Sequence, residues 1–176
     1  MAFENTHELE QHLLGKILTS IQLYNVNDNF LVFNTNTLAV IDGGIELTFE
    51  DHKLVIAWNA EMEMFDVNTS SIQPLLGHLN YYLIDPTDLA VGQQLVGSKL
   101  VSIKTKWNWF QNINDELEPV GAKQYILDEI ILTFENDQTF QIATIEFSVE
   151  NKNISNATFD NQGELLLSVD QIIEIA

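Results

Sequence analysis

Cysteine and arginine are both absent from this 176-residue chain, so lysine supplies all seven of its basic side chains. Without cysteine there is no disulfide framework, no thiolate nucleophile and no Cys-ligated metal. Against the seven lysines stand 26 Asp and Glu residues, which give a formal net charge of −19. Binding a nucleic-acid backbone requires cations that displace condensed counterions. The composition therefore argues against nucleic acid as a partner, and against an anionic membrane surface for the same reason.

Long apolar runs are missing as well. The first residues, MAFENTHELEQHLLGK, are acidic and lack the apolar core of a secretory signal. No stretch approaches the roughly 20 apolar residues that a membrane-spanning helix requires. Apolar residues nevertheless make up 45% of the chain and aromatic residues 10%, which is enough for a packed core. We therefore expect a folded, cytoplasmic protein.

Recognisable catalytic and cofactor motifs are also absent. The chain contains no nucleophile elbow, no phosphate-binding loop and no dinucleotide-binding fingerprint. Its four histidines lack the i, i+4 spacing of a helical zinc site. With 26 carboxylates in the chain, neighbouring acidic pairs arise by chance and do not indicate general acid–base chemistry. We expect no catalytic residues, no cofactor, no metal and a function other than catalysis.

What the chain does contain is an internal repeat. The segment IELTFEDHKLVIAW, residues 45–58, returns at residues 130–144 as IILTFENDQTFQIAT, with one residue inserted in the turn. Upstream, residues 6–21 (THELEQHLLGKILTSI) align without a gap to residues 88–103 (DLAVGQQLVGSKLVSI). Two matched blocks in the same order indicate two related halves, and such a repeat predicts that the two halves contain the same kinds of element.

The two halves have the same expected content. Asn5 is a candidate helix N-cap, with Glu8 three residues later and Gly15 at the position of a helix-ending glycine. The second half repeats this pattern, with Thr87 or Asp88 as the cap and Gly97 as the stop. A strand is expected after each glycine, followed by a long connection and then by a hairpin with the alternation of half-buried strands.

These elements predict an α+β protein in which antiparallel sheet predominates. We expect two tandem pseudo-symmetric units, residues 1–86 and 87–176, each with a short helix, a strand and a β-hairpin. The two units are expected to share one core within one compact domain. A further hairpin is expected around DNQG at residues 160–163. The pattern leaves open whether the strands form one continuous sheet, a sandwich or a half-closed barrel.

The two halves differ most in their long connections, and function concentrates in variable segments carried by a rigid scaffold. The second connection includes KWNWFQNINDELEP, residues 106–119. Aromatic side chains beside charge are typical of a binding hot spot when exposed, whereas large aromatics usually belong to a core. Both interpretations of the tryptophans stay open at this point. The candidate partner-binding residues of this segment are Trp107, Trp109, Phe110, Asp115, Glu116 and Glu118.

A second candidate segment follows the first hairpin, as NAEMEMFD at residues 59–66. Its acidic residues alternate with methionines, so that one strand face is acidic and the other apolar. This is the ordinary pattern of a half-solvated strand, and it would also suit a basic partner. The candidate residues are Glu61, Glu63 and Asp66.

An acidic chain without catalytic motifs, in which a helix ending in LLGK or LVGS precedes strands, resembles the immunity proteins of bacterial toxin–immunity systems. The resemblance implies a cytoplasmic protein that binds a toxin domain and blocks it. We therefore expect a protein-binding inhibitor whose acidic surface steers it toward a basic partner. Two alternatives stay open: a structural module that assembles as a homodimer through its sheet edges, and a small-ligand-binding protein with a site between the units.

Overall fold

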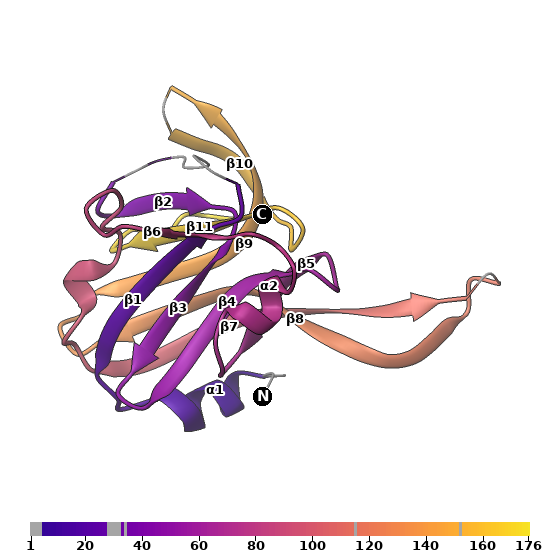
Figure 1. Cartoon of the computed structure of the whole chain (residues 1–176), viewed down its shortest axis with the longest axis horizontal. Helices are drawn as coiled ribbons and strands as arrows, with labels where there is room; N and C mark the ends of the chain where they lie inside the picture. Colours follow the sequence, from indigo (N-terminus) through magenta and orange to yellow (C-terminus); the bar gives the residue numbers. More distant parts are fainter. Residues whose placement is uncertain (1–4, 28–32, 34, 115, 152) are drawn as a thin grey trace.

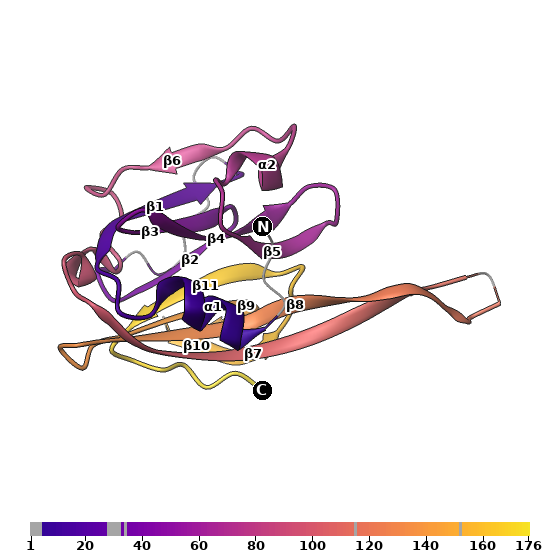
Figure 2. The ribbon, with the colours of Figure 1, turned by 90° about the horizontal axis from the view of Figure 1, so that it is seen from below.

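The chain folds into two stacked β-sheets. The computed structural model describes residues 5–27, 33, 35–114, 116–151 and 153–176. Strands account for 55% of the chain and helices for 9%. The prediction of a fold dominated by antiparallel sheet is therefore confirmed, whereas the helical part of the expected α+β class is small. Figures 1 and 2 show the two sheets as the layers of a sandwich, which is one of the three arrangements that the sequence left open.

The first sheet has five strands in the order β5-β4-β3-β1-β6, and every neighbouring pair is antiparallel. The predicted first hairpin is present as β3 and β4. The strands are β1 (Leu18–Asn25), β3 (Gly44–Phe49), β4 (His52–Asn59), β5 (Met64–Asn68) and β6 (Tyr82–Ile84).

The second sheet has six strands, in the order β2-β11-β9-β8-β7 with β10 also paired to β9. The second predicted hairpin is present as β8 and β9. The prediction of a hairpin around residues 160–163 is wrong, because β10 and β11 do not pair with each other: they follow one another along β9, with which β10 pairs at residues 145–150 and β11 at residues 140–145. The strands are β2 (Leu38–Ile41), β7 (Leu100–Ile113), β8 (Pro119–Phe134), β9 (Thr139–Glu150), β10 (Asn153–Phe159) and β11 (Glu164–Val169). Strand β2 comes from the first half of the chain but pairs with β11, so the two halves are interlocked.

The main hydrophobic core lies between the two sheets. Phe49 and Phe65 of the first sheet and Phe134 and Phe140 of the second are fully buried in it. The helix α1 (Thr6–Leu13) adds buried leucines, and the Asn5 side chain caps it by accepting a hydrogen bond from the Glu8 backbone N–H at 3.1 Å. The predicted N-cap is therefore confirmed, because an Asn oxygen satisfies one of the free N–H groups of the first turn.

The segments 15–18 and 97–100, which align in the repeat, pair with each other where the two sheets meet. Gly15 N–H donates to the Leu100 carbonyl at 2.9 Å, and Leu18 N–H donates to the Ser98 carbonyl at 3.0 Å. Matched residues also make matched contacts with the hairpin turns. The carbonyl of Ile17 accepts from Glu50 N–H at 3.1 Å, and that of Lys99 accepts from Glu135 N–H at 2.9 Å.

The α-helix expected after Thr87 or Asp88 does not form. The helical part of that segment is limited to the 3₁₀ turn η1 (Gln93–Leu95). Gly92, immediately before η1, has a left-handed φ of 78°, and an added Cβ there would lie 3.0 Å from Ile21 Cδ1 and 3.1 Å from the Phe140 ring. A left-handed residue cannot continue an α-helix, so the segment turns instead and delivers its leucines to the core. The one further helix among the described residues, α2 (Gln73–Leu76), covers the outer face of the first sheet.

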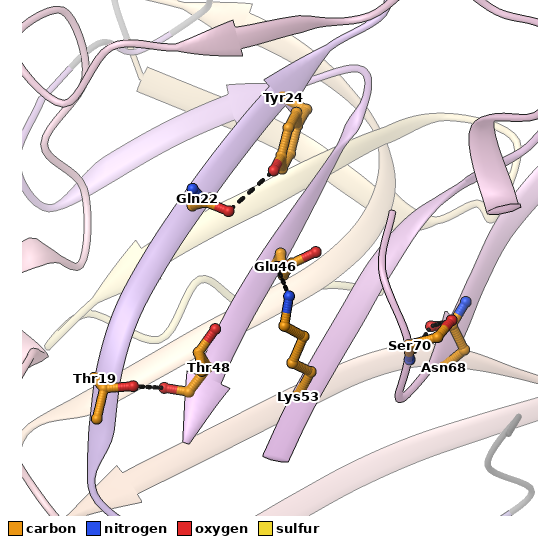
Figure 3. Close-up of polar contacts among 8 residues, drawn as sticks. All are labelled: Thr19, Gln22, Tyr24, Glu46, Thr48, Lys53, Asn68 and Ser70. Carbon is orange, nitrogen blue, oxygen red and sulfur yellow. Dashed lines mark hydrogen bonds and ion pairs between the residues drawn. The ribbon is translucent and has the colours of Figure 1, made fainter. Parts of the chain in front are cut away.

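The outer face of the first sheet carries ordered polar contacts (Figure 3). Lys53 on β4 reaches across to Glu46 on β3 and forms an ion pair with this carboxylate, whose side chain is 5% exposed. The Tyr24 hydroxyl donates to Gln22 Oε1 at 3.1 Å. Burial, followed by the nearby charge of Glu46, raises the pKa of Tyr24 to about 12. Within the described residues, no helix has both the length and the apolar character needed to cross a bilayer.

Candidate functional site

The second long connection is not a loop but the outer part of a long β-hairpin. Strand β9 pairs with β8 only from Glu129 to Thr133, whereas β7 and β8 continue to pair with each other as far as Ile113 and Pro119. Residues 106–127 are here called the arm: its root packs against the main core through Trp107 and Leu127, and its outer part extends beyond the sandwich, as Figures 1 and 2 show. The eight residues 106–113 correspond to about 25 Å of extended strand, and the six of them beyond Trp107 to about 20 Å.

The end of the arm is a compact turn. The Asn114 side-chain oxygen accepts hydrogen bonds from the backbone N–H groups of Glu116, at 3.0 Å, and Glu118, at 2.9 Å. In the backbone, Asn114 N–H donates to the Glu118 carbonyl and Leu117 N–H donates to the Asn114 carbonyl, both at 3.0 Å. Glu116 and Glu118 are exposed, and Asp115 lies outside the described residues. Asn favours such turns because its side chain bonds to the backbone two residues later.

The two tryptophans of the arm have different environments. Trp107 packs against the main core, and its indole N–H is buried without a hydrogen-bond partner. Trp109 lies opposite Tyr125 in the ribbon, and these two side chains are 49% and 45% exposed. The two tryptophans therefore differ: Trp107 is half-buried against the core, and Trp109 is exposed at the surface.

Charges are separated along the arm. The carboxylates all lie in the end turn, whereas strand residues 106–113 and 119–127 carry two lysines and no Asp or Glu. Both lysines lie over aromatic rings: Lys123 Nζ is 3.5 Å from the centre of the Trp109 ring, and Lys106 Nζ is 3.6 Å from that of Phe159. Such cation–π contacts stabilise the lysines locally, so the end of the arm is anionic while its strands are weakly basic.

The second candidate segment forms the turn between β4 and β5. Asn59 organises it, because its side-chain oxygen accepts from Glu61 N–H at 3.0 Å and its backbone carbonyl accepts from Glu63 N–H at 2.8 Å. Glu61 and Glu63 are exposed, whereas Asp66 is half-buried and accepts a hydrogen bond from Asn59 Nδ2 at 3.3 Å. Asp66 is thus partly committed to the fold, and the two glutamates project into solvent.

The two candidate segments meet where the arm leaves the sandwich. A surface groove of about 250 Å³ lies between them, here called the arm-root groove, and it is lined by Glu61, Met62, Met64, Phe110, Asn112 and Gln124. Phe110 and Gln124 are opposite each other in the ribbon. The groove is therefore formed by an aromatic ring and two methionines beside an exposed carboxylate, a combination of apolar contact area and charge.

Four groove residues were not among those predicted from the sequence. Met62 and Met64 alternate with the acidic residues of 59–66, so the sequence already identified them as the apolar face of that segment. Asn112 and Gln124 had no signal of their own, because their position depends on the register of β7 against β8, which has three irregularities. Opposing residues cannot be counted across such bulges from sequence alone.

A second hollow, of about 240 Å³, lies between the sheets and is lined by Val26, Asn27, Asp42, Trp58, Gly163 and Glu164. The Asp42 carboxylate accepts hydrogen bonds from the N–H groups of Val26, at 2.9 Å, and Asn27, at 3.1 Å. Burial raises the pKa of Glu164, and the negative charges of Asp160, Asp42 and Glu146 raise it further. Because its carboxylate accepts these two backbone hydrogen bonds, Asp42 holds the chain at the end of β1 and is not free to bind a ligand.

A third hollow, of about 440 Å³, lies on the other side of the β4–β5 turn, with Trp58, Glu63 and His78 among its lining residues. The turn is anchored between its neighbours, because Gln162 Nε2 donates to the Glu63 carbonyl at 3.2 Å and Phe65 N–H donates to the Asn161 carbonyl at 2.8 Å. Among the residues that the structure describes, no group of three or more His, Asp and Glu side chains is placed to hold a metal ion.

No family model, no curated protein and no solved structure matches this chain.

Proposed function

We propose that this protein is a protein-binding inhibitor of the immunity-protein kind, acting in the cytoplasm on a basic partner. The observation that carries the proposal is the arm-root groove, at which an exposed aromatic-bearing ribbon and an exposed acidic turn lie side by side. Apolar contact area supplies affinity, while exposed charge around it steers encounter and selects the partner. Phe110 is the proposed anchor at the groove, and Glu61 and Glu63 are the proposed steering groups; Trp109, on the opposite face of the ribbon, is not part of this contact.

The rest of the molecule supports this proposal through its charge. A net charge of −19 produces a negative field that accelerates association with a cationic surface and opposes association with an anionic one. The β4–β5 turn is anchored by hydrogen bonds to Asn161 and Gln162, so it presents Glu61 and Glu63 without further ordering. Less conformational entropy is then lost on binding.

The test begins with identification of the partner. The full chain, tagged at its N-terminus, is used as bait in an extract of its source organism, the retained protein is identified, and that protein is produced pure. Association kinetics are then measured at several NaCl concentrations. We expect the association rate constant to fall at least tenfold between roughly 20 and 500 mM NaCl, as electrostatically steered encounters do.

A matched pair of variants separates local from overall charge. E61K/E63K reverses the two exposed charges of the β4–β5 turn, of which Glu61 lines the groove. E150K/E174K reverses two exposed charges elsewhere with the same change in net charge. The first should slow association at low salt about tenfold more than the second, because it acts at the contact. Equal effects of the two variants, or an association rate insensitive to salt, would contradict the proposal.

We also propose that the chain consists of two tandem units, residues 1–86 and 87–176, derived from one ancestral unit. The support is the shared pairing of matched residues. Leu18 pairs with Phe49 and Leu100 with Phe134, and in each case the register shifts before the next pair, at Ser20 and Ser102. Two hairpin pairs with the same irregularity at aligned positions are the expected outcome of duplication.

Assembly as a homodimer is a second candidate, and the arm favours it specifically. In the arm, β8 lacks a partner on its outer edge before Glu129, and β7 is an edge strand. Unpaired edges can pair with another copy, although two bodies of −19 repel each other. Light scattering before and after dilution in 300 mM NaCl distinguishes the two cases, since only a homodimer would dissociate to half its mass.

A further inference from the structure

Leu117, at the end of the arm, combines two features that proteins usually avoid. Its backbone is left-handed, with a φ of 62°, a conformation in which a Cβ is unfavourable. Its side chain is 76% exposed, more than any other large apolar side chain among the described residues. Phe33 also has a positive φ and a large apolar side chain, but its ring packs against Phe147 at 6.2 Å.

The fold gains nothing visible from a leucine at this position. The left-handed turn would form at lower cost with glycine, which adopts positive φ freely. The hydrogen bonds that close the turn use the backbone of Leu117 and the side chain of Asn114, so they do not depend on the leucine side chain. A strained residue that no packing contact compensates is a pointer to function.

The surroundings of Leu117 indicate what it would contact. Exposed carboxylates, Glu116 and Glu118, flank it on both sides, and the turn holds all three in one arrangement. The lysines of the arm lie over aromatic rings away from this turn. A narrow two-stranded ribbon that ends in an apolar side chain between two anions is convex, so its complement is a concave surface with an apolar floor and a cationic rim.

We propose that the end of the arm, at Glu116 to Glu118, inserts into a cationic cleft of the protein partner, with Leu117 as the apolar anchor and Glu116 and Glu118 as its ion-pairing neighbours. This inference rests on the proposed inhibitory function and specifies how it is achieved. Occupation of a concave site by the arm end excludes whatever that site normally binds. The arm-root groove then contacts the rim of the same partner, about 10–15 Å back along the ribbon.

The decisive variant is L117G, because it separates folding from binding. Glycine relieves the left-handed strain, so the midpoint of urea unfolding should stay the same or rise. Affinity for the pure partner, measured by isothermal titration calorimetry, should fall at least tenfold because the anchor is lost. The control is V101A, which removes an exposed apolar side chain at the body end of β7 and should leave affinity within twofold.

A photo-cross-linking amino acid at position 117 locates the contact. We expect the cross-linked peptides of the partner to line one concave, Lys- or Arg-rich cleft. Cross-links to a convex or acidic surface, or an L117G variant that binds as the wild type does, would overturn the insertion while leaving the inhibitory function standing. If the full chain retains no partner that binds it again in pure form, the inhibitory function fails, and this inference fails with it.

Discussion

At the scale of single residues, stability depends on a few buried polar groups of the first sheet. The Glu46 side chain is almost fully covered, and its carboxylate forms an ion pair with Lys53 (Figure 3). A covered carboxylate without its partner carries an uncompensated desolvation cost. The ion pair itself therefore adds little stability, but removal of Lys53 would leave the charge of Glu46 buried without a partner.

K53M tests this ion pair. We expect it to lower the free energy of unfolding by about 1–3 kcal/mol, whereas K104M, at an exposed lysine of β7, should change it by less than about 0.5 kcal/mol. The double variant E46Q/K53M should recover part of the loss, because it also removes the covered charge. Urea denaturation measures all three. No difference between K53M and K104M would show that Glu46 is solvated after all.

Tyr24 predicts a loss of stability in alkali. Its pKa is raised to about 12, so the folded protein retains the phenol proton at a pH where the unfolded chain, with a tyrosine pKa of about 10, has lost it. Below about pH 10 both states are protonated and the group contributes no pH dependence. Above it, the unfolding free energy should fall as pH rises toward 12, and it should fall less in Y24F. The unfolding free energies of wild type and Y24F are measured by urea denaturation at about pH 9 and pH 11. An equal decrease in the two proteins between these pH values would refute the raised pKa of Tyr24.

At the scale of elements, the arm is the part that is separable from the rest. Beyond Asn108, which pairs with Ile126, its strands are covered by neither the first sheet nor β9 along most of their length. A two-stranded ribbon in water is only marginally stable by itself. Its contribution to the stability of the sandwich should therefore be small, and its amides should exchange rapidly.

Excision of the arm tests this separation. Replacing residues 109–125 by Asn-Gly joins two paired residues through a two-residue hairpin turn. We expect the shortened chain to fold, with its unfolding free energy within about 1 kcal/mol of the wild type. It should lose the partner. Hydrogen exchange in the wild type should be at least 100-fold slower at Ile130–Phe134 than at Asn108–Ile113. Failure of the shortened chain to fold cooperatively would place the arm within the folding unit.

At the scale of the whole molecule, the excess of negative charge opposes the compact state. The net charge of −19 is distributed over 176 residues with few cations to offset it. Self-repulsion of this kind is relieved by salt, because the Debye length shortens to about 10 Å at 0.1 M.

Thermal unfolding at low and moderate salt tests this repulsion. Between roughly 20 and 300 mM NaCl we expect the free energy of unfolding to rise by about 1 kcal/mol, which corresponds to about 2–4 °C in Tm for a chain of this length. A neutral osmolyte at equal osmolality serves as the control and should produce a smaller change. A Tm that is constant or falls with NaCl would mean that local ion pairs, rather than net repulsion, dominate.

By itself, the sequence determined the elements whose cause is local. The capped α1, the two hairpins β3–β4 and β8–β9, and the repeat that relates them follow from capping residues, turn residues and alternation, all of which act within a few positions along the chain. The acidic surface and the lack of catalytic motifs were equally evident. Glu61, Glu63, Trp109 and Phe110 were recognised as candidates because their residue types already indicated exposure or contact.

Only the tertiary structure decided how these parts meet. The segment after Pro86 has a helical apolar pattern, but Gly92 fits against Ile21 and Phe140 of the core in a left-handed conformation, and the helix is lost. The connection at residues 104–129 lacks strict alternation, yet β7 and β8 pair through it across three irregularities and form the arm. That register places Trp107 against the core and Trp109 at the surface. It also brings Phe110 to the groove that Glu61 lines. Strand pairing and close packing join residues far apart in sequence, and no local pattern encodes which of the possible registers has the lowest free energy.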